Sequence, residues 1–157
     1  MKDKKVLLMG NPNVGKSTVF NELTGMHQHT GNWTGKTVDS ADGNFYYKYN
    51  NYRLIDLPGT YSLIPSSEEE RVAGEYLLKE KYDCVVIVID STLLQRNLML
   101  FYQILEITNK VVVMLNLCDE AKKRNIEIDK NILSNLLGVP VIKATARSGK
   151  GINELLE

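Results

Sequence analysis

The 157-residue chain has few cysteines, no excess charge of either sign and no long apolar run. Its two cysteines, Cys84 and Cys118, are too few for a disulfide framework and are typical of reduced, buried thiols in a cytosolic protein. Nineteen basic residues balance nineteen acidic ones, so the net charge does not indicate a nucleic-acid or acidic-membrane partner. The apolar run near the N-terminus is too short for a signal peptide, and no other run approaches the ~18 residues of a membrane span. We therefore expect one soluble domain with a substantial core.

The chain does contain a regular alternation of short apolar runs and segments with helical spacing. The runs are residues 6–9, 52–55, 85–89, 111–115 and 139–142. The helical segments are residues 16–23, 71–79, 98–107 and 132–137, the last with Asp129 as N-cap and Gly138 as stop. Because the runs are continuous rather than alternating, they are typical of strands covered on both faces by helices. The pattern predicts a doubly wound α/β domain with a mostly parallel sheet.

Residues 43–56, GNFYYKYNNYRLID, predict an antiparallel pair at one edge of the sheet. The pair Asn50-Asn51 favours a hairpin turn just before the run at 52–55. We expect a six- or seven-stranded sheet that includes this antiparallel edge pair and has helices on both faces. The last residues, GKGINELLE, are typical of the first turns of a helix that stops at Glu157, which hints at a domain taken from a longer chain.

The strongest chemical motif is GNPNVGKS, residues 10–17, which satisfies G-x-x-x-x-G-K-[ST] between a strand and a helix. Its backbone N–H groups would hold phosphate, because unpaired donors and the helix dipole both favour an anion. Lys16 would reach the β- and γ-phosphates, and Ser17 would bind Mg²⁺. The residues expected to form this phosphate site are Gly10, Asn11, Pro12, Asn13, Val14, Gly15, Lys16, Ser17 and Thr18.

A second motif, DLPG, follows the run at 52–55 and consists of Asp56, Leu57, Pro58 and Gly59. A carboxylate at that strand end can hold the Mg²⁺ shell, and Gly59 lets its N–H meet a γ-phosphate and move away after hydrolysis. Alone the motif is weak, but after a phosphate loop and before a helix it is a strong indication.

Two further motifs, NLCD and ATA, indicate which base is bound. Asp119 can accept hydrogen bonds from guanine N1–H and the amino group, and adenine offers neither donor on that edge. We expect Asn116 to brace the loop and the Ala146 N–H to contact guanine O6. The expected base site comprises Asn116, Leu117, Asp119, Ala144, Thr145 and Ala146. Leu117 stands where a lysine is commoner, so we expect weak guanine-nucleotide affinity with fast exchange.

In this order the four motifs resemble those of GTP-binding domains, and the whole chain resembles the N-terminal G domain of FeoB-type prokaryotic ferrous-iron transporters. The resemblance rests on the stretches GNPNVGKSTVFNELTG, HTGNWTGKTVD, DLPGTYSL, NLCDEAKKRNIEID and LLGVPVIKATARSGKGI. It implies a Ras-like P-loop GTPase fold over residues 1–157, with the family's helical spacer and transmembrane domains absent from this chain. The implied function is a GTP-hydrolysing switch that regulates or gates ferrous iron transport at the cytoplasmic face of the cell membrane. G-domain oligomerisation is an option under this resemblance, and no nucleic-acid partner is expected.

The resemblance also implies roles for GNWTGKTV, residues 31–38. Thr37 resembles the switch I threonine that engages Mg²⁺ and the γ-phosphate. The implied nucleotide-contacting stretch is Thr34, Gly35, Lys36, Thr37 and Val38. The carbonyls of Gly31 and Trp33, with the Asn13 side chain, resemble ligands of a K⁺ ion that replaces an arginine finger. The residues implied in catalysis are Lys16, Thr37, Gly59 and Asn13, and the expected cofactors are GTP or GDP, Mg²⁺ and K⁺.

Thr60 follows Gly59 at the position where regulatory GTPases often have a water-orienting glutamine. Its short side chain cannot reach a water as glutamine does, so we expect slow hydrolysis and assign no side-chain general base. Residues 68–70, EEE, are interpreted as the first turn of a helix. His27 and His29 have no carboxylate or cysteine beside them, so we predict no iron site.

Two other functions fit part of the pattern. A ribosome- or tRNA-modification-associated K⁺-dependent GTPase would share the motifs, but the neutral charge without a basic face disfavours an RNA partner. A P-loop kinase for a small molecule has no use for Asp119, so poor competition by ATP against GTP would exclude it.

Overall fold

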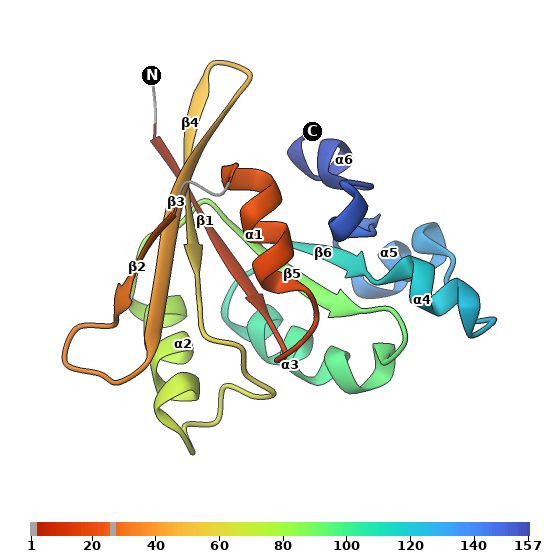
Figure 1. Ribbon diagram of the computed structural model, residues 1–157. Coiled ribbons are helices and arrows are strands. Elements are labelled where there is room, and N and C mark those ends of the chain that lie inside the picture. The colour runs from red at the N-terminus through yellow and green to blue at the C-terminus, as the bar shows by residue number, and fades with distance from the viewer. Residues whose placement is uncertain (1–2, 26–27) are drawn as a thin grey trace.

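The computed structural model describes residues 3–25 and 28–157. Its strands are β1 (Asp3–Gly10), β2 (Gln28–Asn32), β3 (Asp39–Tyr47), β4 (Asn50–Asp56), β5 (Cys84–Asp90), β6 (Val111–Asn116) and β7 (Val141–Lys143). Its helices are α1 (Lys16–Thr24), α2 (Glu68–Lys79), α3 (Leu94–Ile107), α4 (Cys118–Lys123), α5 (Lys130–Leu137) and α6 (Ile152–Leu156), with a short 3-10 turn, η1 (Ala146–Ser148). The strands of the described residues form one seven-stranded sheet in the order β2-β3-β4-β1-β5-β6-β7 (Figure 1). The predicted Ras-like α/β fold is confirmed.

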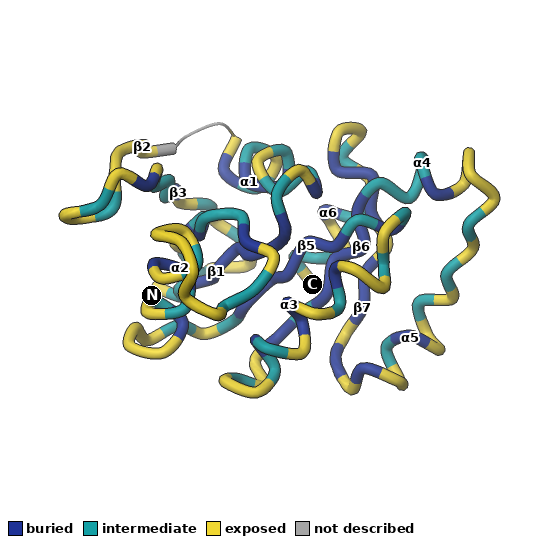
Figure 2. Tube along the Cα trace, turned by 90° about the horizontal axis from the view of Figure 1, so that it is seen from below, coloured by how far each residue is buried: buried dark blue, intermediate teal, exposed yellow. Residues whose placement is uncertain are grey.

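The middle of the sheet is parallel and buried on both faces. β1 runs parallel to β4 and β5, and β6 and β7 continue in the same direction. Side chains from α1 and α6 cover one face, and side chains from α2, α3 and α5 cover the other. Figure 2 shows the central strands as the buried strip of the molecule. This two-sided burial explains why β1, β5 and β6 are continuous apolar runs in the sequence.

The antiparallel edge is present, but its turn is not at Asn50-Asn51. β3 and β4 pair with Tyr47 opposite Asn50, so the turn consists of Lys48 and Tyr49. Both turn residues have positive φ, 42° and 66°, as tight two-residue hairpin turns with the twist of the strands require. The predicted turn was wrong because the cross-strand pairs decide the register, and Phe45 stacks on Tyr52 with ring centroids 4.9 Å apart.

β2 adds one more antiparallel strand outside β3, where the sequence indicated only a loop. Its segment, QHTGN, has no alternating apolar side chains, so the sequence pattern gives no strand signal. Backbone pairing with the edge of β3 forms the strand instead, with Gly31 opposite Ser40. His29 lies exposed on β2, and His27 lies outside the described residues.

The helices follow their capping residues more closely than their apolar periodicity. α2 begins at Glu68, three residues before the periodic segment 71–79, because the Ser67 side chain and Glu70 form a capping box. Residues 68–70 are therefore its first turn, as predicted. α5 has the predicted caps, Asp129 at its start and Gly138 at its end. Among the described residues, no helix combines the length and apolar character needed to cross a membrane. Cys84 and Cys118 are free thiols, as predicted, but they are half-buried where the sequence predicted buried thiols.

Candidate nucleotide-binding site

The GNPNVGKS segment forms a loop between the end of β1 and the start of α1. Gly15 precedes α1 with φ 86°, and a Cβ there would collide with the side-chain amide of Asn116. Asn13 also has a left-handed backbone, with φ 64°, and lies exposed. These two residues turn the chain tightly enough to bring the loop around the N-terminus of α1. A cavity of about 400 Å³ opens there, lined by Asn11, Pro12, Asn13, Gly15, Lys16, Ser17 and Gly59.

The Lys16 ammonium lies between the first two motifs. It donates to the Asp56 carboxylate, and to the Leu57 carbonyl at 2.6 Å. Burial raises the pKa of the Asp56 carboxyl above its ordinary value, and the charge and hydrogen bond of Lys16 offset part of that rise. A phosphate that approached the loop would compete with Asp56 for this cation.

Asp56 and Ser17 have the right chemistry for a small hard cation. The Asp56 carboxylate ends β4, and the Ser17 hydroxyl is exposed in the first turn of α1. Carboxylate and hydroxyl oxygens are the protein ligands that Mg²⁺ takes together with phosphate oxygens. These residues therefore fit Mg²⁺. Thr37 lies exposed in the loop after β2 and does not line the cavity at the phosphate loop.

The DLPG segment is bound along the phosphate loop by its backbone. The Leu57 N–H donates to the Leu8 carbonyl at 3.0 Å, and the Thr60 N–H donates to the Gly10 carbonyl at 3.1 Å. A Cβ on Gly59 would lie 3.2 Å from Pro12 Cα, so glycine allows the two loops to approach each other. Thr60 is buried, and its hydroxyl has no hydrogen-bond partner among the described residues.

Asn116 connects the phosphate loop with the base-binding segments. Its side-chain amide donates to the Val14 carbonyl at 3.0 Å and accepts from the Ala146 N–H at 2.9 Å. The backbone carbonyl of Asn116 accepts a hydrogen bond from the Ser91 hydroxyl at 2.6 Å. Ser91 was not predicted, since a single serine after a strand carries no distinctive signal. The N–H expected to contact guanine O6 thus already has an acceptor, Asn116.

Asp119 lies in the first turn of α4 and is paired with Arg147 of η1. Its other oxygen, Oδ1, is buried and has no hydrogen-bond partner among the described residues. Partial burial raises the pKa of the Asp119 carboxyl. The hydrogen bond from the Glu120 N–H and the charge of the Arg147 guanidinium lower this pKa by more, so it lies below its ordinary value. Leu117, just before α4, has φ 60° and turns the chain so that α4 can begin.

The segment 33–38 closes the β2–β3 hairpin and packs against α2. The Trp33 N–H donates to the Val38 carbonyl at 2.9 Å, and the Lys36 N–H donates to the Trp33 carbonyl at 2.8 Å. The Trp33 ring meets Tyr76 of α2 edge to face, with centroids 5.3 Å apart. Lys36 pairs with Glu68 of α2 at 3.3 Å. The Trp33 side chain, whose role was open from the sequence, therefore attaches this loop to α2.

The structure brings the predicted residues of the phosphate loop and the DLPG, NLCD and ATA segments together, but neither residues 34–38 nor the three implied K⁺ ligands join them. Asn13 lines the cavity at the phosphate loop, whereas Gly31 lines a separate cavity of about 460 Å³ that also reaches Asp56. The Trp33 carbonyl accepts a hydrogen bond inside its own turn. With the loop in this arrangement the three residues do not fit a single K⁺ ion.

Comparison with known proteins identifies the family. A model of the family described as ferrous iron transport protein B matches residues 4–157. The Fe(2+) transporter FeoB of Campylobacter jejuni is 41% identical over 157 residues, which is 100% of this chain but 26% of that protein. The chain thus spans about a quarter of the length of this curated relative.

Solved structures agree with this result. The G domain of the T. maritima FeoB iron transporter is 45% identical, covers 98% of this chain and 94% of that chain, and gives a TM-score of 0.93. The cytosolic domain of the same transporter in a GDP form is 45% identical with a TM-score of 0.94, covering 98% of this chain and 61% of that chain. The chain therefore belongs to the ferrous iron transport protein B family and corresponds to its N-terminal G domain.

Proposed function

We propose that this domain binds and hydrolyses GTP and thereby regulates ferrous iron transport by the rest of a longer polypeptide at the cytoplasmic face of the membrane. The observation that supports it best is Asn116, which hydrogen-bonds both the phosphate loop and the segment after β7. A structural change at the phosphate loop can therefore alter the base-binding segment, and a change at the base-binding segment can alter the phosphate loop. Residues 1–157 would be the G domain, followed by the family's helical spacer and membrane domains.

Each motif has a separate task in this function. Lys16 would move from Asp56 to the β- and γ-phosphates, where its charge is needed. Ser17 and Asp56 would hold Mg²⁺, which when bound neutralises phosphate charge. Asp119 would accept hydrogen bonds from guanine. Gly59 would offer its N–H to the γ-phosphate, and Thr37 would join it after the loop 33–38 moves.

Hydrolysis by this domain should be slow. Thr60 is buried, so its hydroxyl cannot take the place of a water-orienting glutamine. Stimulation by K⁺ would depend on rearrangement of loop 33–38, since the Trp33 carbonyl is held by Lys36 in its turn. Assembly of Asn13, Gly31 and Trp33 around one cation would then supply charge that an arginine finger supplies elsewhere.

Guanine recognition by Asp119 is tested by exchanging the base and the side chain together. In a fluorescent mant-GDP titration of the wild type, GTP should compete far better than ATP. Asp119→Asn should lose guanine affinity and gain affinity for xanthosine diphosphate, because an amide donates to the xanthine C2 carbonyl where a carboxylate cannot. Equal competition by ATP and GTP would exclude the guanine site, and nanomolar GDP retained through purification would contradict the weak affinity we expect.

Potassium dependence is tested by GTP turnover in KCl and in NaCl, for the wild type and for Asn13→Ala. The wild type should turn over faster in KCl, and Asn13→Ala should lose that difference while it still binds mant-GDP. Equal wild-type rates in the two salts would remove K⁺ from the mechanism and leave GTP binding intact.

The relatives favour neither an RNA-associated GTPase nor a small-molecule kinase.

A further inference from the structure

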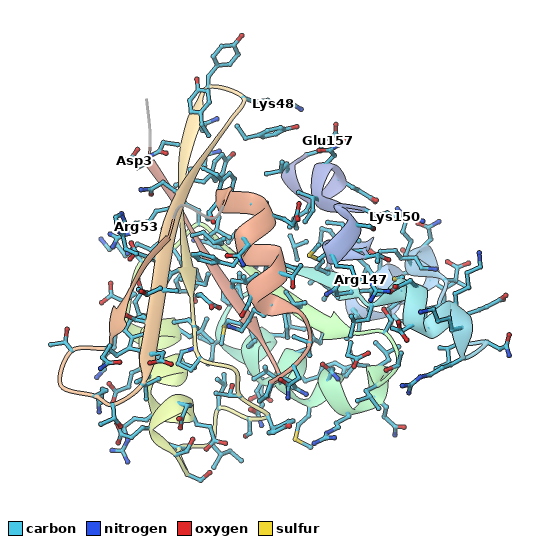
Figure 3. The ribbon with its side chains drawn as sticks, viewed as in Figure 1. Asp3, Lys48, Arg53, Arg147, Lys150 and Glu157 are labelled. Atoms are coloured by element: carbon cyan, nitrogen blue, oxygen red, sulfur yellow. The ribbon has the colours of Figure 1, made fainter. Side chains whose placement is uncertain are left out.

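Arg147 is the one charged residue of η1, and it reaches α4. Its guanidinium Nη2 donates to Asp119 Oδ2 and lies 3.5 Å from Glu120 Oε1. The Arg147 side chain is 62% exposed and that of Asp119 26%, so the ion pair lies at the protein surface, within reach of a ligand. In Figure 3 Arg147 lies between η1 and α4.

The guanidinium offers Asp119 the same kind of donor group that guanine offers. Guanine presents N1–H and an amino group as neighbouring donors, and arginine presents a planar fork of N–H donors. Oδ2 of Asp119 is already bonded to Arg147, and Oδ1 has no hydrogen-bond partner among the described residues. A base that used both oxygens would have to remove Arg147 from Oδ2.

We propose that Arg147 competes with guanine for Asp119 and thereby lowers the affinity of this domain for guanine nucleotides. This inference rests on the proposed guanine contact of Asp119. While Arg147 is paired, the base site is closed, so the apparent dissociation constant equals the intrinsic one divided by the fraction of open sites. Glu120, on the same helix, can accept the arginine when guanine displaces it, which keeps the exchange reversible.

The decisive variant is Arg147→Gln, which keeps a polar side chain of similar length and removes the charge and the fork. We expect mant-GDP to bind about two- to fivefold more tightly, the range for an exposed ion pair, mainly through faster association. Arg147→Lys retains the charge without the fork, so its mant-GDP affinity should lie between those of the wild type and Arg147→Gln. Titration and stopped-flow association kinetics measure both quantities, and the thermal midpoint verifies that each variant is folded.

Two controls separate this competition from general electrostatics. Arg124→Gln removes the same charge at the C-terminal end of α4 and should bind mant-GDP like the wild type. In an Asp119→Asn background, Arg147→Gln should change xanthosine diphosphate affinity much less, because the amide is not held by an ion pair. The ratio of wild-type to Arg147→Gln affinity should also approach one as NaCl is raised, since salt screens an exposed pair.

A loss of GDP affinity in Arg147→Gln would mean that the arginine supports the base, and an unchanged affinity would mean that it does not compete; either result overturns the proposal. A failure of the guanine proposal is seen separately, as wild-type protein that binds ADP as well as GDP. Only tighter GDP binding that disappears with Asp119→Asn supports the competition.

Discussion

Single residues at the phosphate site act through backbone space as much as through side-chain chemistry. Gly15 leaves room for the amide of Asn116, and Gly59 leaves room for the backbone of Pro12. Lys16 and Asp56 form an ion pair, which a bound phosphate or metal ion would have to break. The motif residues determine which atoms are available to bind a ligand. The two glycines determine how closely the loops that carry these atoms can approach each other.

Gly59→Ala should selectively weaken the triphosphate complex. A Cβ at this position would be 3.2 Å from Pro12 Cα and 3.3 Å from Pro12 N, both backbone atoms that cannot rotate away. Overpacking of this kind costs about 1–3 kcal/mol and would displace the Gly59 N–H, which only the γ-phosphate is expected to use. A mant-GTP analogue should therefore bind roughly tenfold more weakly, while mant-GDP binding changes little.

Gly74→Ala is the matched control. A Cβ there would meet only the Leu63 carbonyl, at the ordinary distance of 3.7 Å, and alanine suits a helix interior better than glycine. Its nucleotide affinities should equal those of the wild type. Equal loss of triphosphate and diphosphate binding in Gly59→Ala would show that Gly59 does not distinguish the two.

At the scale of elements, the loop 33–38 and α2 form one unit. Trp33 packs on Tyr76, and Lys36 pairs with Glu68, so the loop is attached at two points of the same helix. Thr37 lies between these attachments in sequence. We therefore expect a motion that brings Thr37 to the nucleotide to break at least part of the contact with α2.

Trp33 fluorescence should report this motion. A slowly hydrolysed GTP analogue with Mg²⁺ should shift Trp33 emission to longer wavelength as the ring leaves Tyr76, whereas GDP with Mg²⁺ should shift it less. Glu68→Gln should move the spectrum part of the way before nucleotide is added, since an exposed pair contributes up to about 1 kcal/mol. Glu69→Gln, one residue along the same helix, is the control. An emission spectrum that does not respond to the analogue would contradict release of the loop.

At the scale of the whole molecule, we expect nucleotide binding and folding to be thermodynamically linked. Asn116 joins the phosphate loop, the segment after β7 and, through its carbonyl, Ser91 after β5. A ligand held by these segments stabilises every strand end that they follow. The predicted consequence is a stability that depends on nucleotide and Mg²⁺ together.

Thermal unfolding measures this linkage. A ligand at 100 times its dissociation constant adds about 2.7 kcal/mol, which for a chain of this size raises the thermal midpoint by roughly 5–10 °C. Removal of Mg²⁺ with EDTA should reverse most of the increase in the wild type. Ser17→Ala should show a smaller increase and little response to EDTA. If EDTA had the same effect on Ser17→Ala as on the wild type, Ser17 would not be an Mg²⁺ ligand.

Much of the molecule could be predicted from the sequence because its information is local. The buried parallel strands are continuous apolar runs, and the caps of α5 are Asp129 and Gly138, which act within one turn. In the GNPNVGKS and DLPG motifs the groups that would bind phosphate and Mg²⁺ lie within a few residues of one another, so the motifs and their position after a strand indicated the phosphate site.

Only the tertiary structure decided what depends on a neighbouring edge or face. β2 has no pattern of its own and exists because β3 offers it backbone partners, and the hairpin turn lies at Lys48-Tyr49 because cross-strand pairing sets its register. The sequence indicated a loop around Trp33 but not the contacts of its side chain, and it gave no signal for Arg147. Those contacts join residues far apart in the chain, Trp33 with Tyr76 and Arg147 with Asp119, and folding alone brings them together.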